Sequence, residues 1–442
     1  MKFSSIKISI LLALLFCFGQ YQAQNSISLE EALQLCLENN YGIRIADMNA
    51  EIARNNNNWG AAGRLPRLDL NVNGSRFQSG NPGTFVPQRT NVSVSPNLSW
   101  TLFDGYRVSA SKARLEELEK LSDGNAAIVI ENNLQAVILA YYQAILAQEQ
   151  LEVLQEVLNN SRERFNYESY KKDIGSSSSF DLLQFQNAIF TDSANLISQE
   201  VQLRNAIRSL KLVMGVAQET EVSPSDPLKD NFEALSWDKM REKMMADNNN
   251  LKNQYINNHI LREEIRLAKA NLYPTVSLNL GTTYSAGRLQ LINRDPSTAE
   301  QMPFVPTNIT AFDYSASVSI SFNLYNGGNT RRLIENARIN ERIGQVQQEE
   351  LERSLENDLS ISFDQYESRR QLVELRKASV ENAKQSMDMS KDRLQNGLIT
   401  SIDYRNIQLQ YLNAQFAKFQ ALSSLKESET ELMRLTGALL RE

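Results

Sequence analysis

The chain has 442 residues, a formal net charge of −6 at neutral pH, one histidine and two cysteines. This acidic balance argues against nucleic acid as a partner. One histidine and two cysteines exclude the usual zinc sites and make a Ser-His-Asp triad implausible, and the sequence has no glycine-rich phosphate loop. We therefore expect neither an enzyme nor a bound cofactor.

The first 23 residues have the pattern of an export signal. The positively charged Lys2 and Lys7 precede an apolar run from Ile8 to Phe18, and Ala23 precedes the expected cleavage point. The run is too short to span a membrane as a helix. The rest of the sequence has no long apolar run, so insertion into a membrane would require a closed β-barrel.

The mature chain is predicted to be a tandem repeat of one large unit. Ser28 and Asn40 recur as Ser236 and Asn248 at one constant offset, and later pairs keep a second, slightly larger offset. The offset changes in a loop rich in glycine and proline, where insertions are tolerated. The predicted domains are a signal peptide at 1–23, a first repeat at 24–222 and a second repeat at 223–442.

Each repeat is predicted to contain a helix, a strand, a loop, a second strand and two long helices joined by a turn. Alternating apolar and polar residues predict the strands, and proline-free stretches with helical apolar spacing predict the helices. A helix from Arg107 to Tyr170 would extend roughly 100 Å and would need neighbouring helices to bury its apolar stripe. The predicted strands are about 67–77, 90–102, 274–285 and 311–324, and the predicted helical hairpins are about 105–215 and 327–437.

The strands are predicted to carry one apolar and one polar face. A soluble sheet over a core and a barrel between lipid and water both show this pattern, so both interpretations stay open. Pro96 lies within the second strand and indicates a bulge or an edge position there. The predicted polar face, which would line the lumen of a barrel, holds Ser93, Ser95, Asn97, Ser99, Ser315, Ser317, Ser319 and Ser321.

Four strands per chain cannot close a barrel. An open strand edge is excluded in lipid, so closure would need several copies of the chain. Two copies would supply eight strands, whose interior side chains fill. Three copies would supply twelve strands and leave a lumen, which suits the small polar residues of the predicted inner face.

The two long hairpins reverse at matched turns. Each turn has a basic residue, a glycine and an aspartate at the same spacing: Lys171, Gly175 and Asp181 in the first, and Arg393, Gly397 and Asp403 in the second. A structural interpretation is sufficient, in which the glycine ends one helix and the aspartate caps the next. The functional alternative is that the aspartates narrow a channel entrance and favour cations.

Several motifs, in this order along the chain, resemble the TolC-like outer-membrane efflux proteins. Their order and duplication make the resemblance specific, and it covers essentially the whole mature chain. The motifs are SLEEALQLCLENN at the opening helix, RLPRLDLNVNG and NLYPTVSLNLG before the strands, LFDGYR and LYNGGN after them, and NGLITSID at the second hairpin turn.

The resemblance implies a mixed, mostly α-helical fold that forms a homotrimeric duct. A twelve-strand β-barrel would lie in the lipid of the outer membrane, and a long α-helical barrel would extend into the periplasm. The duct would be a passive exit of a tripartite efflux or type I secretion system, with a periplasmic adaptor protein and an inner-membrane pump as partners. The transported substrate, whether drugs, metals or proteins, would be selected by the pump.

The resemblance also places Asp181 and Asp403 on tip aspartates of the family, at the periplasmic entrance. The family's gating tyrosine and arginine positions hold Leu394 and Ile399 here, and a further aspartate of its constricting ring is Asn406. Two alternatives remain on the sequence alone. One is a soluble periplasmic coiled-coil adaptor or scaffold, and the other is a secreted enzyme with helical insertions.

Overall fold

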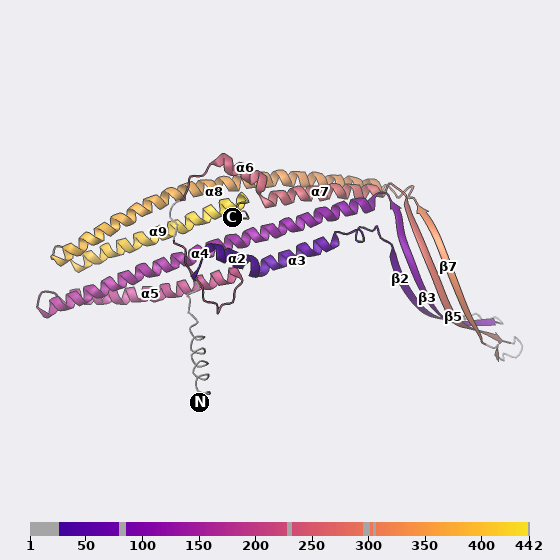
Figure 1. Ribbon diagram of the computed structural model, residues 1–442, viewed down its shortest axis with the longest axis horizontal. Helices are drawn as coiled ribbons and strands as arrows, with labels where there is room; N and C mark the ends of the chain where they lie inside the picture. The colour runs from indigo at the N-terminus through magenta and orange to yellow at the C-terminus, as the bar shows by residue number, and fades with distance from the viewer. Residues whose placement is uncertain (1–25, 79–84, 228–231, 295–300, 304–305, 441–442) are drawn as a thin grey trace, which may run out of the picture. The chain divides into compact units, whose positions relative to one another are not determined.

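The computed structural model describes residues 26–78, 85–227, 232–294, 301–303 and 306–440 (Figure 1). The predicted signal peptide at 1–23 lies outside the described residues. The chain divides into two compact units. The first, here called the helical unit, comprises Met1–Met48, Gly124–Lys252 and Glu350–Glu442, and the second, the strand unit, comprises Asn49–Asp123 and Asn253–Glu349.

Most of the described chain is helical, and the two repeats contain matching helices. In each repeat the first long helix has 67 residues. The first repeat has α2 (Leu29–Asn39), α3 (Tyr41–Asn56), α4 (Arg107–Asp173) and α5 (Ser179–Met214), and the second has α6 (Trp237–Asp247), α7 (Asn249–Ala270), α8 (Asn329–Gln395) and α9 (Ser401–Leu435). No helix in the described part of the chain has both the length and the hydrophobicity of a membrane span.

Each repeat opens with two helices, where the sequence pattern predicted one. The break falls at Asn40 and at its repeat equivalent Asn248. The side-chain Nδ2 of Asn40 donates to the Val213 carbonyl at 2.8 Å, and the side-chain Nδ2 of Asn248 donates to the Leu435 carbonyl at 3.0 Å. The side-chain oxygen of Asn40 accepts from the Gly42 amide at 2.8 Å. An asparagine that binds backbone groups on both sides thus ends one helix and starts the next.

The helical unit buries its apolar stripes in separate clusters along the helices. One surrounds Tyr141 and Leu210, and another surrounds Tyr366 and Leu425, all of which are 0–1% exposed. The Tyr141 hydroxyl donates to the Ile27 carbonyl at 2.8 Å, where β1 (Ser26–Ile27) pairs in parallel with β4 (Ser223–Pro224). Burial against neighbouring helices stabilises helices of this length far more than intrinsic propensity does.

The strand unit contains one antiparallel sheet with the strand order β2, β3, β5, β7 (Figure 1). Its strands are β2 (Arg67–Gln78), β3 (Phe85–Asp104), β5 (Thr275–Arg294) and β7 (Thr307–Ser321), and the short β6 (Gln301–Pro303) pairs with the far end of β5. Among the described residues, β2 pairs with β3 alone and β7 with β5 alone. The sheet therefore has two free edges.

The strands differ from the predicted ones in their ends, including those of β7, and in the local structure at Pro96. First, β5 continues to Arg294 and β3 begins at Phe85, so both extend well into the segments predicted as loops. Second, the bulge or edge position predicted at Pro96 is wrong. Central strand β3 pairs on both sides, and its register shift lies between Thr101 and Phe103. Because proline has no N–H, the ladder between β3 and β5 is instead interrupted at Pro96 and its neighbour.

Candidate functional site

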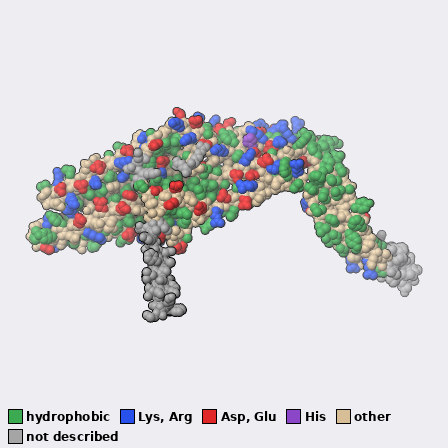
Figure 2. Space-filling model, viewed as in Figure 1, with side chains coloured by type: hydrophobic (Ala, Val, Ile, Leu, Met, Phe, Trp, Pro, Cys, Tyr) green, Lys and Arg blue, Asp and Glu red, His purple; other side chains and the backbone are tan. Residues whose placement is uncertain are grey.

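The sheet carries an exposed apolar face built from matched rows of side chains. Leu98 of β3 lies in register with Leu68 of β2 and Leu280 of β5, and Leu280 lies in register with Ala316 of β7. Leu68 is 73% exposed. Figure 2 shows hydrophobic side chains gathered over the strands. Further exposed members of this face are Leu70, Val72, Val92, Val94, Trp100, Tyr284, Phe312, Tyr314, Val318 and Ile320.

The height of this apolar face matches the apolar core of a membrane. The rows from Val276 to Ala286 are ten steps apart along β5, or about 33 Å along the strand at about 3.3 Å per residue. Strands tilted by about 40° would give a band about 25 Å tall, the height found in outer-membrane barrels. An exposed apolar surface of this size needs an apolar surrounding rather than water.

The opposite face of the sheet is polar, and the predicted lumen residues lie on it. Ser99 lies in register with Asn279, and Asn279 with Ser317. The hydroxyls of Ser95 and Thr283 are 3.0 Å apart across β3 and β5. By register and alternation, all eight predicted lumen residues share this face: Ser93, Ser95, Asn97, Ser99, Ser315, Ser317, Ser319 and Ser321.

The hairpin turns are the other candidate site. The spacing of basic residue, glycine and aspartate that the two turns share has a geometric cause. Gly175 and Gly397 adopt left-handed φ angles of 77° and 69°. The amide after each glycine donates to the carbonyl of Lys171 at 2.7 Å or of Arg393 at 2.9 Å, which closes a Schellman motif. The basic residues thus occupy the last turns of α4 and α8, where positive charge is favourable.

The two aspartates lie one turn inside the following helices, not at the cap itself. The N-cap residues are Ser178 and Thr400, whose hydroxyls accept from the amides of Asp181 at 3.1 Å and Asp403 at 3.2 Å. The Asp403 carboxylate accepts from the Thr400 amide at 3.0 Å and completes a capping box. The prediction that aspartate caps each helix is therefore corrected, because the smaller hydroxyl takes that position.

Asp181 also connects the tips of the two hairpins. Its carboxylate accepts from the Ser178 hydroxyl at 2.6 Å and from the Ser401 hydroxyl at 2.5 Å, and these bonds lower its pKa. The Thr400 hydroxyl and amide likewise lower the pKa of Asp403. Both pKa values are depressed, so the hydrogen bonds to the two carboxylates stabilise the folded protein fully above the ordinary aspartate pKa of about 3.9. This stabilisation is lost as the pH falls through the lowered pKa values.

The positions that carry gating residues in the resembled family are apolar here and pack together. Leu394 is 5% exposed and lies in one cluster with Phe185 and Tyr404, and Ile399 packs against them. The guanidinium of Arg164 lies 5.1 Å from the centre of the Tyr404 ring. Apolar packing and a cation–π contact thus join the tips at these positions. Asn406 is exposed.

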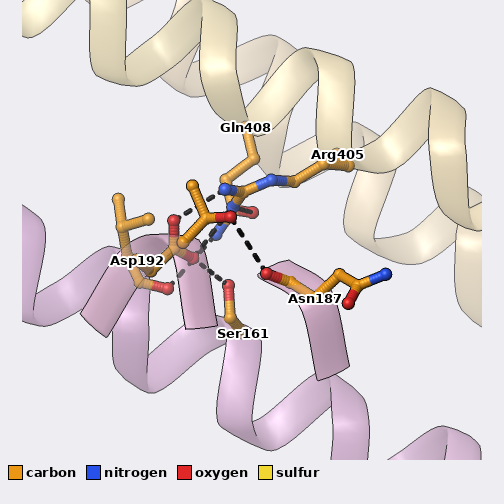
Figure 3. Close-up of polar contacts among 7 residues, drawn as sticks. Ser161, Asn187, Asp192, Arg405 and Gln408 are labelled. Carbon is orange, nitrogen blue, oxygen red and sulfur yellow. Dashed lines mark hydrogen bonds and ion pairs between the residues drawn. The ribbon is translucent and has the colours of Figure 1, made fainter. Parts of the chain in front are cut away.

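A buried ion pair that the sequence pattern did not indicate joins the two hairpins near their tips (Figure 3). Arg405 of α9 donates to both carboxylate oxygens of Asp192 of α5, at 2.6 and 2.9 Å. Ser161 of α4 donates to the same carboxylate at 2.6 Å, and Arg405 also donates to Gln408 at 2.8 Å. The Asp192 side chain is fully buried. Three helices from both repeats therefore meet at one charge pair.

The molecule is similar to known export channels. A family model described as outer membrane efflux protein matches residues 32–216 and again residues 241–438. The alkaline protease secretion protein AprF of Pseudomonas aeruginosa is 22% identical over 426 residues, which cover 92% of this chain and 82% of AprF.

Two solved structures show the same fold. The CmeC outer membrane channel of Campylobacter jejuni matches with a TM-score of 0.73 and 15% identity, over 92% of this chain and 85% of that one. The open state of the MtrE outer membrane channel of Neisseria gonorrhoeae matches with a TM-score of 0.71 and 18% identity, over 92% and 88% of the two chains.

The buried ion pair yields a prediction for stability. Asp192→Ala leaves the Arg405 charge without its carboxylate and should destabilise the protein by about 3–5 kcal/mol. Asp388→Ala removes an exposed carboxylate of α8 and should change stability by less than about 0.5 kcal/mol. Thermal unfolding followed by circular dichroism measures both. Equal melting temperatures for the two variants would show that the pair does not hold the hairpins together.

Proposed function

The chain belongs to the outer membrane efflux protein family, and we propose that three copies of it form the exit duct of a tripartite export system. As a member of this family it is an outer-membrane channel of efflux or secretion systems and not an enzyme. The proposal concerns how the duct is assembled, where substrates enter it and which partners it requires.

The single observation that most supports the proposed trimer is that the sheet with the apolar face has two free edges. In lipid, each unpaired N–H and C=O group of an edge strand costs free energy, so β2 and β7 both need a partner strand. Pairing β7 of one copy with β2 of the next satisfies both edges and repeats around a ring. Three copies give twelve strands and a barrel wide enough for a lumen.

The two faces of the sheet support the same arrangement. The apolar face would contact lipid, and the polar face with Ser95, Asn97 and Ser317 would line a water-filled lumen. A soluble coiled-coil adaptor, the alternative left open by the sequence, gives no reason for an apolar sheet face exposed over about 25 Å.

We place the substrate entrance at the hairpin tips in the periplasm. Asp181 and Asp403 of three copies would contribute six carboxylates near one axis. A periplasmic adaptor would contact the helices and connect the duct to an inner-membrane pump, which supplies the energy and selects the substrate. AprF is described as a protease secretion protein and CmeC as an outer membrane channel. Because the pump would select the substrate, the duct itself would not determine which cargo passes through it.

The assembly is tested by its mass. Protein extracted from outer membranes in mild detergent should give, in native mass spectrometry, three times the mass of the mature chain. The free edges predict this number because three copies are the smallest ring of these sheets that leaves a lumen. A water-soluble monomer after signal cleavage would contradict the duct.

The entrance is tested by a charge change that keeps the helix cap. Both Thr400 donors reach the same oxygen of Asp403, Oδ2, so the amide oxygen of Asp403→Asn can still accept them. We expect trimer stability to be nearly unchanged and the cation over anion permeability ratio in planar bilayers to fall by roughly half.

Asp364→Asn is the matched control, because it removes an exposed carboxylate from α8 at a distance of about thirty residues from the turn. It should leave ion selectivity unchanged. Equal selectivity of the Asp403→Asn protein, the control and the native protein would limit the role of Asp403 to the capping box with Thr400.

A further inference from the structure

Among the residues whose side chains are described, the apolar face of the sheet ends in two polar rows at the end farthest from the helices. Arg76 of β2 lies in register with Thr90 of β3, Thr90 with Arg288 of β5, and Arg288 with Asn308 of β7. In the next row, Gln88 lies in register with Gln290. Both arginines are exposed. Figure 2 shows basic side chains at this end of the hydrophobic band. The apolar face thus terminates in hydrogen-bond donors.

Arg76 and Arg288 differ from the other charged residues of the four strands whose side chains are described. Arg67, Asp69, Arg89 and Asp313 alternate onto the polar face, so among charged residues with described side chains only Arg76 and Arg288 extend the apolar face. Neither forms an ion pair with a described carboxylate. The Gln88 amide, turned to present its oxygen, accepts from Arg76 at 2.5 Å.

A guanidinium on a lipid-facing surface is costly at the centre of the bilayer and tolerated where the headgroups begin. The two arginines therefore mark the level of the headgroups at the helix-free end of the barrel. This end faces the cell exterior if the helices lie in the periplasm, so the inference rests on the proposed function.

We propose that Arg76 and Arg288 form a site for the phosphates of an anionic glycolipid in the outer leaflet. Their strands are separated by β3, so the two Cα positions are about 10 Å apart, with the Thr90 hydroxyl between them. Two guanidinium groups at this separation suit a headgroup with two phosphates, because each binds a phosphate through paired hydrogen bonds.

The neighbouring rows supply the rest of the site. Acyl chains would contact the apolar rows directly below, which include Val92, Val94, Tyr284 and Phe312. The Gln88 and Gln290 amides, one row beyond the arginines, would bind sugar hydroxyls. This order of contacts along the strands follows the order of groups in a phosphorylated glycolipid, from chains to phosphates to sugar.

The chain offers a matched control on the same strands. Arg89 is the residue next to Thr90 and lies in register with Phe77 and Leu289, on the polar face of the sheet. It is exposed, like Arg76 and Arg288. Replacing Arg89 removes a positive charge at the same level of the barrel from the side that would not contact lipid.

The test is a titration of the detergent-purified full-length protein with lipid A, read as bound lipid by native mass spectrometry. The combined Arg76→Gln and Arg288→Gln variant should bind lipid A about tenfold more weakly or worse. Arg89→Gln should bind like the native protein. Dephosphorylated lipid A should bind the native protein as weakly as lipid A binds the double variant, because the phosphates are the recognised groups.

Three outcomes would overturn the site. They are equal lipid A binding by the native protein and the double variant, an equal loss in Arg89→Gln, and equal affinity of the native protein for phosphatidylglycerol and lipid A. The same spectra report the oligomer, so a trimer that fails these tests leaves the duct intact. A monomer would contradict the duct, and the lipid comparison would still decide the site because both arginines lie on one chain.

Discussion

The unpaired edges of β2 and β7 are the constraint on which the rest of the molecule depends. In water these edges could bind solvent, but one face of their sheet is apolar over about 25 Å and belongs in lipid. Lipid offers backbone groups no hydrogen bond, and these free edges are the reason why we propose that several copies form the working unit. In the proposed trimer, the sheet whose register runs from Leu68 through Leu98 and Leu280 to Ala316 would form one third of the closed barrel.

The duplication gives the helical unit two hairpins whose tips can bind each other. Each tip has the same local chemistry, a glycine that ends one helix and a hydroxyl that caps the next. The contacts between the tips are not duplicated, because Asp181 accepts from Ser401 and Asp192 binds Arg405 while the reverse pairs do not occur among the described contacts. In these two contacts the first repeat supplies the acceptor and the second supplies the donor, so the two repeats have different roles in them.

Local patterns predicted the parts of the fold that local forces determine. Alternation along β3 indicated its two faces, and Gly175 and Gly397 indicated the turns, because period and left-handed φ are set by neighbouring residues. The helix break at Asn40 was missed, since its cause is a hydrogen bond to Val213 far along the chain. Asp192 was missed for the same reason, because its partner is 213 residues away and only packing of the hairpins brings them together.

Closure between copies is tested most directly by disulfides across the β2 and β7 edges. In a background with buried Cys36 replaced by alanine, Asn71→Cys on β2 would be combined in turn with Ser315→Cys, Ser317→Cys and Ser319→Cys on β7. Ser95→Cys with Thr283→Cys, neighbours within one sheet, is the control for oxidation. Edge pairing predicts covalent dimers and trimers for one of the three combinations in oxidised outer membranes. Monomers in all three, alongside a complete intrachain control, would contradict it.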